Sequence, residues 1–80
     1  MNKTYETKDF YLAVSLRAFG YMIQSLKRID AKSVMFIFDN HDGKIGDAIK
    51  AYWDRKLLVD GRSFVDSVAE LKTRMYDKNL

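Results

Sequence analysis

The spacing of apolar residues along the chain predicts three helices and a hairpin of two strands. The first helix spans Phe10–Phe19, where apolar side chains occupy nearly the whole circumference and only Ser15 and Arg17 interrupt them. We expect Thr7 to cap the start of this helix and Gly20 to end it. Because a helix that is apolar almost all round must be covered on more than one side, we expect it to be deeply buried or to meet a partner.

The two strands are predicted over Tyr21–Arg28 and Ser33–Phe38, with a connection between them that is short enough for a hairpin. The second strand is apolar on both faces, which is typical of a buried strand. A sheet of only two strands is marginally stable in water. We therefore expect a third strand from Met1–Glu6, from Leu57–Val59 or from a second copy of the protein. The alternative for Leu57–Val59 is a buried loop.

Two more helices are predicted in the second half of the chain. One spans Lys44–Arg55 and follows a turn rich in Asp, Asn and Gly. The other begins after its expected cap, Asp60, with Ser63 and Asp66 as an alternative capping box. The predicted fold class is α+β in the order α-β-β-α-α, with an antiparallel, hairpin-centred sheet packed against three helices. The last helix carries a clear apolar stripe: Phe64, Val68, Leu71 and Met75.

Length and composition limit the class of protein. The 80 residues form one small domain, residues 1–80, with 48% hydrophobic and 31% charged residues, a globular balance. The chain has no Cys, which excludes disulfides and a thiol nucleophile. No apolar run approaches the ~18 residues that span a bilayer, and no secretory signal is evident, so we expect a cytoplasmic protein.

Residues with catalytic or metal-binding chemistry are sparse. His41 lies between Asp39 and Asp42, but nothing elsewhere clearly completes a metal shell, so a turn with a helix cap is the expected role. No serine stands in a recognisable motif with a base. A core this small also leaves little room for a deep substrate cavity. We therefore expect no enzymatic activity, cofactor, metal or small-molecule substrate.

The charge balance admits a nucleic-acid partner. The net charge is +3, from 14 Lys and Arg against 11 Asp and Glu. Tyr21, Tyr52 and Trp53 are aromatic residues that could stack on bases, although Tyr52 and Trp53 are equally suited to a core. The alternative for the basic residues is a solvated rim. The candidate phosphate contacts are Lys27, Arg28 and Lys32 at the hairpin end, and Arg55, Lys56 and Arg62 around the loop between the second and third helices.

The apolar excess favours a protein partner instead. The first helix and the second strand offer more apolar faces than a small monomer easily covers, and exposed apolar patches mark partner surfaces. The alternative is a monomer in which the last helix covers one face and the N-terminal segment the other. The candidate interface residues are Leu12, Leu16, Phe19, Met35 and Ile37.

The residues Thr7–Ala13, read as Thr-Lys-Asp-Phe-Tyr-Leu-Ala, resemble the start of a family of small uncharacterised domains of unknown function from bacteria and their phages. Members of that family continue with a strand rich in Val and Phe, matched here by Val34–Phe38. They often carry Asn-Gly after a Tyr, where this chain has Trp53, Asp54 and Arg55. The similarity covers roughly residues 5–75. Its closing motif is matched by Tyr52, Leu58, Val59, Asp60, Arg62, Phe64, Leu71 and Lys72.

The resemblance implies a small standalone bacterial or phage domain and names no catalytic residue. Combined with the composition and the apolar excess, it leads us to expect a non-enzymatic accessory domain that acts through protein–protein contact or self-association. The alternative expectation is a nucleic-acid-binding accessory protein that uses a basic hairpin.

Overall fold

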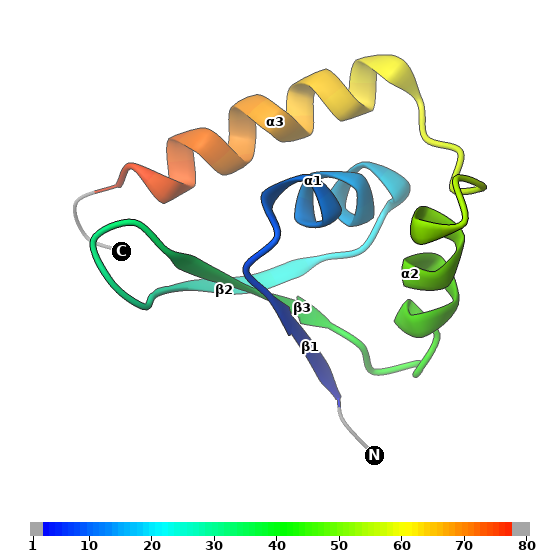
Figure 1. Ribbon diagram of the computed structural model, residues 1–80, viewed down its shortest axis with the longest axis horizontal. Helices are drawn as coiled ribbons and strands as arrows, with labels where there is room; N and C mark the ends of the chain where they lie inside the picture. The colour runs from blue at the N-terminus through cyan, green and yellow to red at the C-terminus, as the bar shows by residue number, and fades with distance from the viewer. Residues whose placement is uncertain (1–2, 78–80) are drawn as a thin grey trace.

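The computed structural model describes residues 3–77, which form six elements in the order β-α-β-β-α-α (Figure 1). The α+β class is confirmed, and the predicted order is corrected by one additional strand at the start. The elements are β1 (Thr4–Thr7), α1 (Phe10–Phe19), β2 (Ile23–Arg28), β3 (Val34–Asp39), α2 (Ile45–Trp53) and α3 (Gly61–Met75).

The additional strand, β1, completes a three-stranded sheet in the order β1-β3-β2. Both β1 and β2 pair antiparallel with β3, and Thr7 of β1 lies opposite Phe36. The third strand therefore comes from the N-terminal segment, as one of the three alternatives predicted. Leu57–Val59 is not a strand but part of the connection between α2 and α3. Because β1 and β2 run in the same direction on either side of β3, α1 is the crossover between them.

The strand β3 is buried because it is central in the sheet and covered by helices on one face. Val34, Phe36 and Phe38 point into the core and are almost fully buried. Met35 and Ile37 alternate with them, so they lie on the opposite face, where they are half-buried. Both faces of this strand are apolar because one face is almost fully buried and the other is half-buried.

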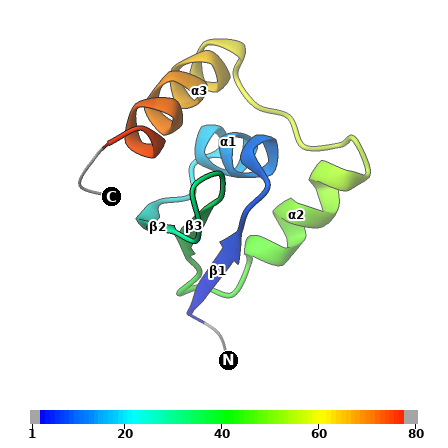
Figure 2. The same cartoon turned by 60° about the vertical axis from the view of Figure 1, so that its left-hand side comes forward.

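The helix α1 lies at the centre of the molecule, between the sheet and α3, with α2 along its flank (Figures 1 and 2). Five consecutive residues, Leu12 to Leu16, are buried, which requires cover on more than one side. The stripe of α3 supplies that cover: Leu71 is fully buried, and Phe64, Val68 and Met75 pack against the same core. The nearly all-round apolar pattern of α1 is therefore satisfied within one chain.

The caps of the helices differ from expectation at one position. Asp9, not Thr7, caps α1, because its carboxylate Oδ1 accepts a hydrogen bond from Leu12 N at 3.0 Å. Thr7 is instead the last residue of β1, and its hydroxyl accepts from Asp9 N at 3.1 Å. Asp60 caps α3 as predicted, since its Oδ2 accepts from Ser63 N at 2.8 Å.

In the part of the chain that the structure describes, no helix is both long and apolar enough to cross a bilayer.

Candidate functional site

An open apolar groove of about 440 Å³ lies beside α2. Three segments form it: the residues that end α1, one face of α2, and the connection between α2 and α3. The groove is shallow and open to solvent, and its charged rim is described below. Its apolar lining consists of Phe19, Tyr21, Ala48, Ala51, Leu57 and Leu58.

The aromatic end of the groove is positioned by the C-terminus of α1. Gly20 has φ 124°, and its N–H donates to Arg17 O while Tyr21 N donates to Leu16 O at 3.0 Å. This pair of hydrogen bonds is the Schellman arrangement, in which a glycine in the left-handed region ends the helix. The turn places the rings of Phe19 and Tyr21 in a stack, with centroids 6.1 Å apart and planes at 19°.

The opposite side of the groove is positioned by the C-terminus of α2, which ends in the same way. Lys56 N donates to Ala51 O at 2.8 Å and Arg55 N to Tyr52 O at 3.1 Å. Here the left-handed position, φ 62°, is occupied by Arg55 rather than by glycine. The turn returns the chain along α2, so that Leu57 is half-buried and Leu58 is 85% exposed.

The charged groups of the groove are Lys44, Lys56 and Asp47. Neither lysine takes part in the ion pairs found among residues 3–77. The lysine of α2 that does so is Lys50, which pairs with Asp54. Burial raises the pKa of the Tyr21 hydroxyl, and the negative charge of Asp47 raises it further. Tyr21 is thus a neutral aromatic side chain at physiological pH, and the lysines give the groove a slight positive excess.

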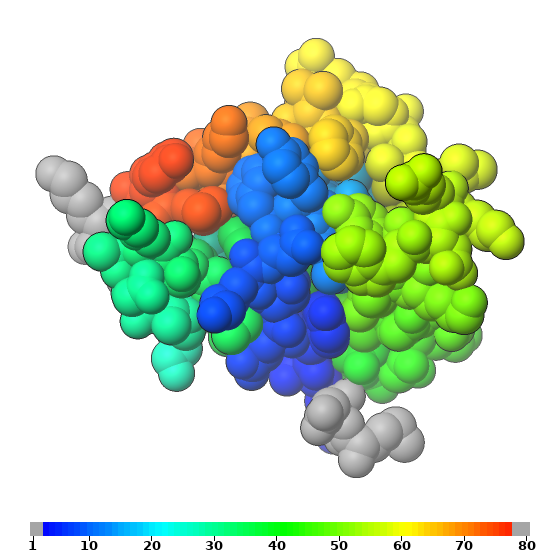
Figure 3. Space-filling model, viewed as in Figure 1, coloured from blue at the N-terminus to red at the C-terminus, as the bar shows by residue number. Residues whose placement is uncertain are grey.

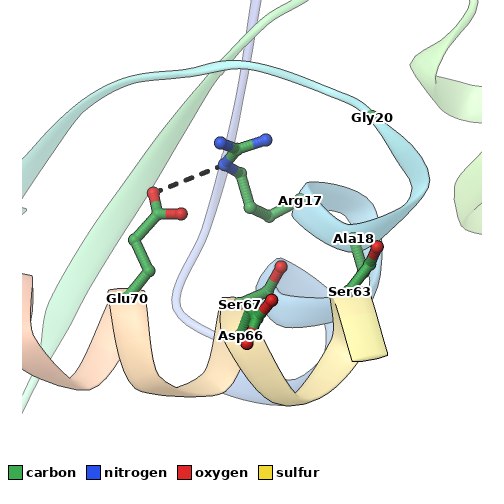
Figure 4. Close-up of a pocket in the computed structure, with 7 residues that line it drawn as sticks. All are labelled: Arg17, Ala18, Gly20, Ser63, Asp66, Ser67 and Glu70. Carbon is green, nitrogen blue, oxygen red and sulfur yellow. Dashed lines mark hydrogen bonds and ion pairs between the residues drawn. The ribbon is translucent and has the colours of Figure 1, made fainter. Parts of the chain in front are cut away.

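A smaller polar depression of about 250 Å³ lies between α1 and α3 (Figure 4). Arg17 and Glu70 face each other across it, with Nε 3.3 Å from Oε2. Ser63, Asp66 and Ser67 line it from α3, the same helix that carries Glu70, and Asp66 is paired with Arg62. The hydroxyl and the backbone N–H of Ser63 both donate to the Asp60 carboxylate, which caps α3. These interactions join α1 to α3 and cap the start of α3.

The structure separates the six basic residues predicted to contact phosphates into two groups. One group lies at the β2–β3 hairpin and the other at the α2–α3 connection, on opposite sides of the molecule in Figure 1. Two of the residues have partners: Arg62 Nε lies 3.3 Å from Asp66 Oδ1, and Arg28 Nη2 donates to Met75 O at 2.5 Å. No single surface therefore contains Lys27, Arg28, Lys32, Arg55, Lys56 and Arg62 together.

The predicted protein-interface residues are also divided, and two of them need correction. Leu12 and Leu16 are 2% and 0% exposed, so they are core residues and not available to a partner. The physical reason is that α3 packs on the face of α1 that a partner would have covered. Phe19 is half exposed at the groove. Met35 and Ile37 lie apart from it, on the open face of the sheet.

The turn around His41 is an exposed structural feature. The Nδ1 atom of His41 lies 2.8 Å from Oδ2 of Asp39, and this hydrogen bond holds the pKa of the Asp39 carboxyl below its usual value. Within residues 3–77, no three histidine or carboxylate side chains come together as a metal site would need. The predicted turn is present, but the predicted helix cap is not, because the N-cap position of α2 is Lys44, which makes no side-chain capping hydrogen bond.

Several exposed groups were missed by the sequence reasoning. Leu58 was assigned to a strand or a buried loop but is exposed, and Tyr11 and Tyr76 were not considered as surface aromatics. Trp53, for which core and surface positions were both open, is exposed, and its ring packs edge-on against half-buried Tyr52. In the sequence, the exposure of Tyr11 is indicated only by its place in the first turn of a helix. The exposure of Tyr76 is indicated only by its place near the end of the chain.

Comparison with known proteins identifies a family for the chain. The model of a family described as a domain of unknown function (DUF5659) matches residues 2–77. No curated protein and no solved structure matches the chain. Since the match covers nearly the whole sequence, the chain belongs to this family of domains of unknown function, DUF5659.

Proposed function

We propose that the protein is a small, non-enzymatic, cytoplasmic accessory domain that binds a segment of another protein in the groove beside α2. The observation that carries this proposal is the apolar lining of an open hollow, with Leu58 85% exposed and Phe19 half exposed at its edge. A bacterial or phage origin, expected from the sequence resemblance, is part of the same proposal.

Exposed leucine and phenylalanine side chains favour binding because their apolar surface is in water until a partner covers it. Covering apolar area contributes about 25 cal/mol per Å². The volume of about 440 Å³ falls within the range of known ligand pockets, roughly 300–1,000 Å³. An open groove whose lining includes the small side chains of Ala48 and Ala51 suits a peptide segment better than an enclosed small molecule.

The charges at the rim indicate the chemistry of the partner. Lys44 and Lys56 outnumber Asp47, so a segment with an apolar anchor and neighbouring Asp or Glu residues is complementary to the groove. The same rim disfavours a basic segment. The proposed occupant is therefore an apolar peptide segment with acidic flanks, contributed by a partner protein.

The test is selection from a phage-displayed library of random peptides against the full chain, followed by fluorescence polarisation with the selected peptides. We expect apolar anchors flanked by acidic residues. The Leu58→Ser variant should weaken binding about tenfold or more, since burying a leucine contributes about 1.5–3 kcal/mol. Val65→Ser is the matched control, because Val65 is an exposed apolar residue on α3 outside the groove.

Two outcomes would overturn the proposal: failure to enrich any peptide, or peptides that bind wild type and Leu58→Ser equally. Light scattering addresses the other occupant, a second copy. If wild type is a dimer that Leu58→Ser dissociates, the occupant of the groove is a second copy of the chain and not a peptide of another protein. If wild type and Leu58→Ser are both monomers, the groove is free for the proposed partner.

A further inference from the structure

A second surface lies at the hairpin end of the molecule, and its chemistry differs from that of the groove. Tyr11 in the first turn of α1 and Tyr76 at the C-cap of α3 are 61% and 76% exposed. Both line one open depression of about 200 Å³, together with Phe10, Lys72 and Met75. Two exposed phenol rings thus flank a lysine on a single surface.

The ring of Tyr11 is supported on its inner side by rings that reach into the core. It packs edge-on against Phe10, with centroids 5.2 Å apart and planes at 77°, and Phe10 in turn contacts the ring of buried Phe36 at 6.3 Å. A ring that is held by the core on its inner side and open on its outer side loses little conformational freedom when a flat group stacks on it. This arrangement favours the binding of planar ligands.

The basic hairpin lies beside Tyr76 because it is joined to the end of α3. Arg28 of β2 donates a hydrogen bond from Nη2 to Met75 O at 2.5 Å, which brings the hairpin beside Tyr76. Figure 3 shows the green hairpin against the red end of α3 on one continuous surface. Lys8 is close enough to the hairpin for its charge to lower the pKa of the Asp30 carboxyl, although the main cause of that shift is the hydrogen bond from Lys32 N.

Three carboxylates near this end are engaged in structural contacts. Asp9 caps α1, Asp30 accepts from Lys32 N at 2.8 Å, and Glu70 lies between Arg17 and Arg74. The ion pairs described for residues 3–77 include none of Lys8, Lys32 and Lys72. Lys72 lines the depression together with the two tyrosines, so its charge is available to a ligand there.

We propose that this surface binds single-stranded nucleic acid, with bases stacked on Tyr11 and Tyr76 and the phosphate backbone held by Lys8, Arg28, Lys32 and Lys72. Aromatic side chains that alternate with cations are the usual means of binding unpaired bases without sequence preference. A duplex offers only phosphates, because its bases are already stacked on one another. The surface is independent of the groove and of the function proposed for it.

The test is fluorescence anisotropy with labelled oligonucleotides of about 20 residues: a DNA strand, an RNA strand and a DNA duplex, from about 50 to 200 mM NaCl. We expect at least one single strand to bind more tightly than the duplex, with affinity that falls as salt rises. Tyr76→Ala should weaken binding about fivefold or more, since stacking is worth about that much per base. Lys32→Gln should reduce the salt slope by about 0.7 for a single strand.

Trp53→Ala is the matched control, since Trp53 is an equally exposed aromatic residue on α2, outside this depression. It should leave nucleic-acid binding unchanged, as should Leu58→Ser. A preference for RNA would indicate contacts to the 2′-hydroxyl, and equal binding of DNA and RNA would indicate recognition by stacking and charge alone. The proposal is overturned if neither strand binds at about 50 mM NaCl, if the duplex binds more tightly, or if Tyr76→Ala and Trp53→Ala have the same effect.

Discussion

Arg17 of α1 and Glu70 of α3 form an ion pair, with Nε 3.3 Å from Oε2, and thereby join the central helix to the outer one. Arg74 Nη1 lies 3.6 Å from the same Glu70 oxygen. All three side chains are partly exposed, so water screens their attraction and limits its contribution. The apolar stripe of α3, and Leu71 above all, must therefore provide most of the energy that holds α3 in place.

We expect Glu70→Gln to lower the free energy of unfolding by less than about 1 kcal/mol, because exposed ion pairs seldom contribute more. Leu71→Ala should lower it by about 2–5 kcal/mol, because it removes a fully buried side chain and leaves a cavity. Urea denaturation followed by Trp53 fluorescence measures both. A larger loss for Glu70→Gln than for Leu71→Ala would show that the ion pair, not the stripe, anchors α3.

Leu16 and Phe19 separate a core role from a surface role on the same helix. Leu16→Ala should cost about 2–5 kcal/mol, comparable with the roughly 5 kcal/mol expected for the whole domain, so this variant should be largely unfolded. Phe19→Ala should cost only about 1 kcal/mol, because the ring is half exposed and loses chiefly its stack on Tyr21. Circular dichroism during thermal unfolding compares the two, and a fully stable Leu16→Ala protein would contradict the central position of α1.

The sequence predicted more of the fold than of the surfaces. The apolar pattern of Phe10–Phe19 correctly indicated cover on more than one side, but periodicity alone does not distinguish α3 from a partner chain as the covering element. That ambiguity is why Leu12 and Leu16 were assigned to an interface. Thr7 and Asp9 are both good capping residues, and only the pairing of Thr7 with Phe36 in the sheet decided between them.

The groove could not be predicted, because it depends on how separate elements pack. Ala48 and Ala51 are among its lining residues, and nothing local in the sequence marks an alanine on a helix as a groove residue. The exposure of Leu58 follows from the turn after α2, not from the apolar character of Leu57–Val59. Likewise, Tyr11 and Tyr76 are 65 positions apart, and only the packing of α3 on α1 brings them to one surface.

The turn after α2 yields a further prediction. Arg55 occupies a left-handed position with φ 62°, which costs any residue other than glycine free energy because of its Cβ. Arg55→Gly should therefore raise the free energy of unfolding by about 0.5–1 kcal/mol. Gly20→Ala makes the opposite change, because it adds a Cβ at a left-handed position with φ 124°. No atom lies within 4 Å of the added Cβ. The substitution should destabilise by about 1–2 kcal/mol through backbone strain alone.

Urea midpoints of the two variants provide the measurement. We expect the two variants to change the free energy of unfolding in opposite directions. A destabilising Arg55→Gly would mean that the Arg55 side chain stabilises the fold by more than its left-handed backbone costs. A neutral Gly20→Ala would mean that the end of α1 can rearrange without losing its last turn.

The cap of α3 predicts a dependence of stability on pH. Hydrogen bonds from Ser63, chiefly from its backbone N–H, hold the pKa of the Asp60 carboxyl below its usual value of about 3.9. Because the folded-state pKa is the lower one, the stability that this carboxylate contributes is fully present only above about pH 5. It is lost as the pH falls through the unfolded-state and then the folded-state pKa.

Asp60→Ala removes the cap and should lower the urea midpoint at pH 7. Asp60→Asn keeps an acceptor oxygen and should retain most of the stability that the cap contributes. Asp30 and Asp39 also have lowered pKa values, so all three proteins weaken in acid, and the difference between them isolates Asp60. The gap between wild type and Asp60→Asn should narrow as the pH falls from about 5 to 2, since protonation removes the charge that distinguishes them. A gap that stays constant over this range would show that the negative charge of Asp60 is not what distinguishes the two proteins.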